Sequence, residues 1–265
     1  MESLRELYRI GRGPSSSHTM GPAYAAGLFR QAYPQADRFL VTLYGSLAKT
    51  GRGHLTDAAV SDALAPCPSQ ILFDTAATGF KHPNTLDFTA YRGESKLGAW
   101  RVYSVGGGKI EIEGFPPVAP QTIYPLHTFT GIKAECAKRG IRLWQYVESC
   151  EGPGIWEYLA DVWRQMKATV GKGLAAQGTL PGGLGVRRKA RELLEGESQN
   201  DTAEMRESRL VYAYAFAASE ENAGGGTIVT APTCGASGVV PAVMLFKQEQ
   251  HGFSDQEILR ALAAA

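Results

Sequence analysis

Hydroxyl and imidazole side chains are concentrated in one short run near the N-terminus. Residues 15–19 read Ser-Ser-Ser-His-Thr, a Gly–Pro pair lies on each side, and an alanine-rich apolar segment over 23–33 follows. The apolar segment predicts a helix, with Thr19 as its N-cap. Hydroxyls and free backbone N–H groups at the positive end of a helix dipole suit a carboxylate or a phosphate, and His18 can exchange a proton near neutral pH. The run therefore predicts an anion site with acid–base chemistry; the alternative is a polar turn that only caps a helix.

A second histidine lies in a glycine-punctuated segment over 49–57, which reads Lys-Thr-Gly-Arg-Gly-His-Leu-Thr-Asp. Gly51 and Gly53 would let the backbone come close to a ligand. His54 precedes the expected start of another helix at Thr56 or Asp57. The segment predicts a second group for proton transfer; the alternative is a loop histidine that hydrogen-bonds its own turn.

A third candidate site is the small-residue loop over 230–238, which contains Cys234 and leads into an apolar helix. Small residues allow a bulky inorganic centre to approach, and a thiolate can ligate it. One cysteine cannot hold a cluster alone, because cubane clusters use three or four thiolates. The alternative for Cys234 is a small buried core residue.

Together, these segments resemble the bacterial iron–sulfur-dependent L-serine dehydratases of the single-chain type. The resemblance rests on SSSHTMGP at 15–22, on LPGGL with RRKA over 180–190, and on ENAGGGTIVTAPTCGASG at 221–238. The segment at 49–57 also resembles the family pattern KTGxGHxTD, with Leu55 standing where a small residue is expected. Some relatives have cysteine at the position of Ser237 and asparagine at that of Cys234.

The resemblance implies conversion of L-serine into pyruvate and ammonia, with a 4Fe–4S cluster as cofactor. It implies that His18 and His54 are catalytic, and that Cys234 ligates the cluster, whose remaining ligands are expected beyond residue 265. The expected substrate-binding residues are Ser15, Ser16, Ser17, Thr19, Asn222 and Thr233.

Two alternatives to this function remain open from the sequence. The same scaffold could act on another small amino or hydroxy acid, such as L-cysteine or L-threonine. A chain of this kind could also be a non-catalytic regulatory module that binds serine or another carboxylate.

The elements that must position these residues predict an α+β protein. We expect an α/β substrate-binding domain over 1–114, with a strand at 38–44, a glycine-rich loop at 44–54, a helix at 56–64 and a hairpin of strands at 100–105 and 109–113. A proline-rich linker is expected over 115–127, because four prolines in about ten residues suit neither a helix nor a central strand. Beyond it, apolar residues at spacings of three and four predict a helical catalytic domain over 128–265. Helices are expected near 156–170, 202–218, 238–250 and 254–265, and the last pattern stops without a C-cap, which suggests an incomplete domain.

Bulk properties exclude several partners. The 265 residues include 27 basic and 26 acidic side chains, a formal net charge of +1, which gives no reason to expect nucleic acid or a membrane surface as a partner. No apolar run approaches the roughly 20 residues of a membrane helix, and the N-terminus lacks a signal-peptide core. We therefore expect a cytoplasmic enzyme. Its expected partners are a small-molecule substrate and a second copy of the chain in a homodimer.

Overall fold

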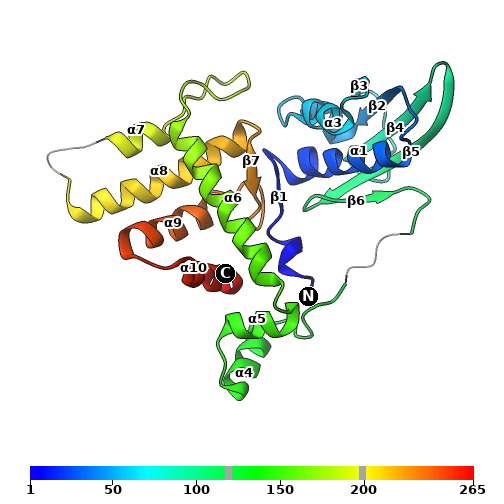
Figure 1. The fold of residues 1–265 in the computed structure, drawn as a ribbon. Coiled ribbons are helices and arrows are strands. Elements are labelled where there is room, and N and C mark those ends of the chain that lie inside the picture. Colours follow the sequence, from blue (N-terminus) through cyan, green and yellow to red (C-terminus); the bar gives the residue numbers. More distant parts are fainter. Residues whose placement is uncertain (117–120, 197–200) are drawn as a thin grey trace. The chain divides into compact units, whose positions relative to one another are not determined.

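The computed structural model describes residues 1–116, 121–196 and 201–265, which divide into two compact units (Figure 1). The sheet unit comprises Arg12–Val118, and the helical unit comprises Met1–Gly11 and Ala119–Ala265. The expected α+β class, with a sheet domain followed by a helical region, is confirmed. None of the described helices is apolar over enough residues to cross a bilayer.

The sheet unit contains one five-stranded sheet with strand order β3-β2-β4-β5-β6. Its strands are β2 (Arg38–Tyr44), β3 (Ser69–Asp74), β4 (Thr85–Arg92), β5 (Ser95–Gly106) and β6 (Lys109–Ile112). β2 and β3 run parallel, and every other neighbouring pair is antiparallel. The expected hairpin at Gly107 and Gly108 is confirmed as the β5–β6 turn, whereas the sequence reading did not predict β3 or β4.

Helices α1 (Gly21–Ala32) and α3 (Thr56–Leu64) pack side by side against one face of this sheet. Alternate strand residues such as Val41, Phe88 and Val102 are buried toward the helices, as the two-residue period of a strand requires. Phe29 of α1 lies at the centre, with its ring centroid 5.2 Å from that of Phe88. This packing fixes the N-terminal end of α1, where the serine-rich run lies.

The helical unit is built around two long helices, α6 (Ile155–Ala175) and α8 (Ala203–Ala223). Their backbones touch at Gly173, where an added Cβ would lie 2.1 Å from the carbonyl oxygen of Ala217, so only glycine fits. The other elements of this unit are a 3₁₀ turn at Leu4–Glu6, β1 (Ile10–Arg12), α4 (Phe129–Arg139), α5 (Leu143–Glu151), α7 (Ala190–Glu195), β7 (Thr227–Val229), α9 (Val239–His251) and α10 (Asp255–Ala264).

The first eleven residues belong with the helices, whereas the sequence reading began the first domain at residue 1. β1 pairs with β7, and the buried Tyr8 donates a hydrogen bond of 3.0 Å to the carbonyl oxygen of Leu262. Part of the expected linker over 115–127, residues 117–120, lies outside the described residues. The buried Tyr124, also within the expected linker, packs in the core of the helical unit.

Two local expectations are wrong. Thr19 is not an N-cap: a π-helical turn over Ser16–Met20 leads directly into α1, and the cap is Ser15, whose side chain accepts from the N–H of His18. The expected loop at 44–54 contains a short helix, α2 (Gly45–Thr50), in whose first turn the N–H of Ser46 donates to the carbonyl oxygen of Pro83 at 2.8 Å.

The backbone at Gly45 is suited to glycine alone, so replacing this residue should destabilise the protein. It has φ of +52°, and an added Cβ would lie 2.4 Å from the carbonyl oxygen of Pro83. Gly45→Ala should therefore lower the free energy of unfolding by roughly 1–3 kcal/mol. The control is Gly27→Ala in α1, where nothing lies within 4 Å of the added methyl group, and it should raise stability by about 0.5–1 kcal/mol. Urea denaturation measures both, and equal stabilities of the two variants would contradict the strain at Gly45.

Candidate active site

His18 and His54 lie against each other at one end of the sheet unit. Their ring centroids are 4.5 Å apart and their planes are tilted by 31°. His18 comes from the π-helical turn before α1, and His54 from the turn between α2 and α3. The structure thus brings together two histidines that are 36 residues apart in the sequence.

Two reciprocal hydrogen bonds hold these histidines in place. The hydroxyl of Thr19 donates to the carbonyl oxygen of His54 at 2.7 Å, and the hydroxyl of Thr56 donates to the carbonyl oxygen of His18, also at 2.7 Å. Both threonines are completely buried. Thr19, expected among the substrate-binding residues, therefore uses its only hydroxyl proton to position His54.

The ring of His18 is held at both nitrogens by serine hydroxyls. Nδ1 lies 3.1 Å from Oγ of Ser17, and Nε2 lies 2.9 Å from Oγ of Ser46. Burial lowers the pKa of His18 below its usual 6.5, and the neighbouring His54 lowers it further. The neutral form is therefore favoured, so one ring nitrogen donates to its serine and the other accepts.

The ring of His54 is oriented differently. Nδ1 lies 3.0 Å from the carbonyl oxygen of Thr50, which can only accept, so Nδ1 carries a proton. In the neutral ring, Nε2 then has the free lone pair. This is the tautomer that a general base attacking with Nε2 requires.

The serines of the run take different positions. Ser15, Ser16 and Ser17 are all half-buried. Ser15 caps the π-helical turn, and the carbonyl oxygen of Ser17 accepts from the buried hydroxyl of Ser104 on β5 at 2.7 Å. All three serines are therefore partly open to solvent beside His18.

The remaining expected site residues, Asn222, Thr233 and Cys234, belong to the helical unit. Asn222 is buried near the end of α8, and Thr233 is exposed and accepts from the N–H of Ala236 at 3.2 Å. Two of the family-like segments meet here, since Arg188 pairs with Glu221 at 3.0 Å and Glu220 accepts from the N–H of Lys189 at 2.6 Å.

The Cys234 loop offers one thiol to a metal. Burial raises the pKa of Cys234 to about 11, and beside it in the same turn the hydroxyl of Ser237 is buried without a hydrogen-bond partner. Within the part of the chain that the structure describes, no three His, Cys, Asp or Glu side chains are grouped as a metal site. The described residues therefore fit one ligand position of a cluster and do not hold a cluster by themselves.

The sequence reading missed several residues that organise the histidines. The hydroxyls of Ser46, Thr56 and Ser104 reach the side chain of His18 or the backbone of residues 17 and 18, and the hydroxyl of Thr50 donates to the carbonyl oxygen of Ser46. Ser46 and Thr50 were obscured because α2 was expected to be a loop. Ser104 had no local signal, because its contact with Ser17 spans 87 residues.

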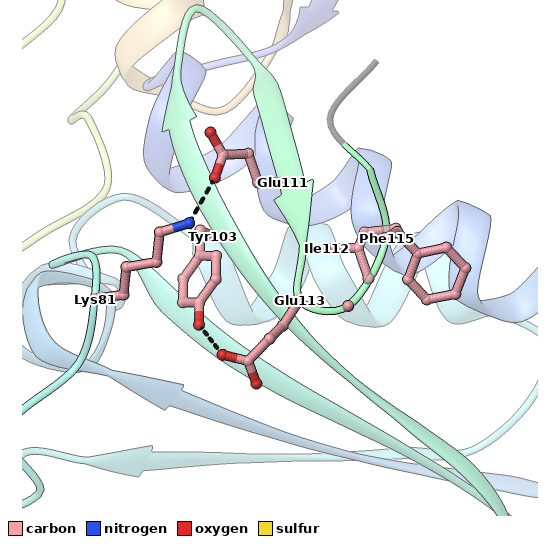
Figure 2. A pocket seen from close by; sticks show the side chains of 7 residues that line it. Lys81, Tyr103, Glu111, Ile112, Glu113 and Phe115 are labelled. Atoms are coloured by element: carbon pink, nitrogen blue, oxygen red, sulfur yellow. Dashed lines mark hydrogen bonds and ion pairs between the residues drawn. The ribbon is translucent and has the colours of Figure 1, made fainter. Parts of the chain in front are cut away.

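A separate pocket of about 340 Å³ lies beside β5 and β6 (Figure 2). Lys81 pairs with Glu111 at 3.2 Å, and the hydroxyl of Tyr103 donates to Glu113. These polar groups satisfy one another, and the pocket has no histidine. The histidine pair is therefore the stronger candidate for catalysis.

Because the two histidines lie in contact, the pKa of His18 should depend on His54. The pKa of His18 should lie below 6.5, and His54→Asn should raise it because the second positive charge is removed. Burial is the larger cause, so the value should stay below 6.5 in the variant. Two-dimensional NMR titration of the ring protons measures this, with His251→Asn in the helical unit as the control. A pKa of His18 that does not respond to His54→Asn would contradict the coupling.

Comparisons with known proteins identify the family of this chain. The profile described as serine dehydratase alpha chain matches residues 124–265, and that described as serine dehydratase beta chain matches residues 3–69. L-serine dehydratase 2 of Escherichia coli (strain K12) is 30% identical over 93% of this chain and 66% of its own length. The L-serine dehydratase of Haemophilus influenzae is 31% identical over 94% of this chain and 67% of its own length, and that of Streptomyces coelicolor is 30% identical over 99% and 70%. This chain spans about two thirds of the length of these relatives. The chain belongs to the serine dehydratase family.

Proposed function

We propose that this protein takes part in the dehydration of L-serine to pyruvate and ammonia, and that the histidine pair of the sheet unit performs the proton transfer. The observation that carries the proposal is the orientation of His54, whose Nδ1 is committed to the carbonyl oxygen of Thr50. The names of the relatives support L-serine as the substrate. No finding supports the regulatory module or the other small acids as alternatives.

The reaction needs a base at one carbon and help for the leaving group at the next. Nε2 of His54 would take the proton from Cα, and the β-hydroxyl would leave as water after gaining a proton. The product, aminoacrylate, tautomerises to an imine, which reacts with water to give pyruvate and ammonia. A positioned general base of this kind contributes roughly 10²–10⁴-fold to the rate.

His18 would serve the same reaction without gaining a charge. Its lowered pKa keeps it neutral beside a protonated His54, where a second positive charge would be costly. One ring nitrogen accepts from a serine hydroxyl, and the other donates to the second serine. The serine that accepts from the ring therefore has a hydroxyl proton that is not used in the contact with His18. That hydroxyl can donate to an oxygen of the substrate.

The half-buried Ser15, Ser16 and Ser17 would bind the substrate carboxylate. Hydrogen bonds to a charged group are worth roughly 1.5–3 kcal/mol each. Thr19 acts indirectly, by holding His54 in place. Asn222 and Thr233 of the helical unit remain proposed substrate-binding residues, and a cytoplasmic homodimer remains a prediction.

We further propose that Cys234 provides one ligand to a 4Fe–4S cluster, with the other ligands coming from outside the described residues. When bound, such a cluster would supply a Lewis acid for the departing hydroxyl. The buried hydroxyl of Ser237 supports the proposal, because it is a polar atom without a protein partner in the same turn.

Two substitutions should separate proton transfer from substrate binding. In the holoenzyme, His54→Gln should lower kcat by about 10²-fold or more with little change in KM, because only the base is lost. Ser16→Ala should raise KM by roughly tenfold, because one donor to the carboxylate is lost. A steady-state pyruvate assay measures both, and a His54→Gln enzyme with the kcat of the wild type would contradict the assignment of the base.

The cluster proposal is tested by metal content. Cys234→Ser in the holoenzyme should reduce bound iron and sulfide, because a serine hydroxyl is a poor replacement for thiolate. The matched control is Cys136→Ser, which changes another buried cysteine, on α4, and should leave iron content unaltered. Full iron and sulfide content in the Cys234→Ser protein would contradict the ligand assignment and would mean that Cys234 is only a buried core residue.

A further inference from the structure

Asn84 lies immediately before β4, on the same face of the sheet as the histidine pair. Residues 86, 88 and 90 of β4 are buried toward the helices, so the two-residue period places the side chain of Asn84 on that face as well. On β5 the same period places Ser104 with Val102 on this face. Asn84 and Ser104 lie opposite each other, since the N–H of Ser104 donates to the carbonyl oxygen of Asn84 at 2.9 Å.

Contacts of its neighbours place Asn84 between the two serines that hold His18. The carbonyl oxygen of Pro83 accepts from the N–H of Ser46 at 2.8 Å. On the other side, the hydroxyl of Ser104 donates to the carbonyl oxygen of Ser17 at 2.7 Å. The backbone on both sides of Asn84 is therefore tied to the segments that carry Ser17 and Ser46.

Only the nitrogen of the Asn84 side-chain amide has a hydrogen-bond partner. Its Nδ2 donates to the carbonyl oxygen of Ser104 at 3.3 Å, and because a carbonyl oxygen only accepts, this contact fixes which end of the amide is nitrogen. Its Oδ1 is buried and has no hydrogen-bond partner. A buried acceptor without a donor lowers the stability of the folded protein. The unpaired Oδ1 therefore points to a donor that arrives with a ligand.

We propose that Oδ1 of Asn84 accepts a hydrogen bond from the α-ammonium group of the amino-acid substrate. This inference rests on the proposed function, and it adds how the site distinguishes an amino acid from a hydroxy acid. The serine hydroxyls can donate to a carboxylate, whereas an ammonium group has only donors and needs an acceptor. An amide oxygen supplies that acceptor without a negative charge, so it does not oppose binding of the carboxylate or hold a proton on His54.

Two variants with side chains of nearly the same size as asparagine test the role of Oδ1 separately from that of Nδ2. Asn84→Leu and Asn84→Asp both lose the donor to Ser104, but only the aspartate keeps an oxygen for the ammonium group. The ligands are L-serine and 3-hydroxypropanoate, which has the same carboxylate and hydroxyl but no amino group. Isothermal titration calorimetry on the full chain gives the dissociation constant of each, and thermal unfolding controls for folding.

The wild type should bind L-serine roughly tenfold to hundredfold more tightly than 3-hydroxypropanoate. Asn84→Leu should remove this preference, and Asn84→Asp should keep or increase it. A Leu variant that retains the preference of the wild type, or a wild type without any preference, would overturn the role of Asn84 and leave the proposed function standing. If the Leu variant does not fold, the Asp variant decides, because a preference below that of the wild type overturns the proposal. A wild type that binds neither ligand would contradict the proposed function and this inference with it.

Discussion

The geometry of the candidate site depends on the exchange of hydrogen bonds between Thr19 and His54 and between Thr56 and His18. Each threonine is one or two residues from one histidine in the sequence and binds the backbone of the other. Because both threonines are buried, neither hydroxyl is drawn away by water, and removing either would take a hydrogen-bond donor from the carbonyl oxygen of a histidine. The two imidazoles are therefore held in contact by the backbone, and their rings remain available for hydrogen bonds with serines and substrate.

Helix α2 connects the two halves of this arrangement. The hydroxyl of Ser46 reaches the ring of His18, and the carbonyl oxygen of Ser46 accepts from the hydroxyl of Thr50, whose own carbonyl fixes the ring of His54. A helix of six residues has little stability of its own. It is held at its start by the left-handed conformation of Gly45 and by Pro83. One short element thus sets the tautomer of one histidine and the environment of the other.

The sequence predicted the parts of the site that depend on local patterns. The serine–histidine run, the glycine-rich segment before His54 and the long amphipathic helices all carry such signals, and the α+β class and the family were predicted correctly. Thr19 was misassigned as a cap because a π-helical turn has no distinctive composition, and its contact with His54 spans 35 residues. Asn84 and Ser104 could not be identified, because their importance comes from strand register. Whether His18, His54 and Cys234 perform the expected chemistry is still a prediction.

The path of the chain has a consequence for how the protein is made. Residues 1–11 pack with the helical unit, and Tyr8 of this segment bonds to Leu262, which is 254 residues later. The sheet unit is therefore an insertion within the helical unit. During synthesis from the N-terminus, the sheet unit emerges complete and can fold while the ribosome is still adding the helices. Tyr8 cannot bond to Leu262 until α10 has been made, so this part of the helical core closes only after the whole sheet unit has been synthesised.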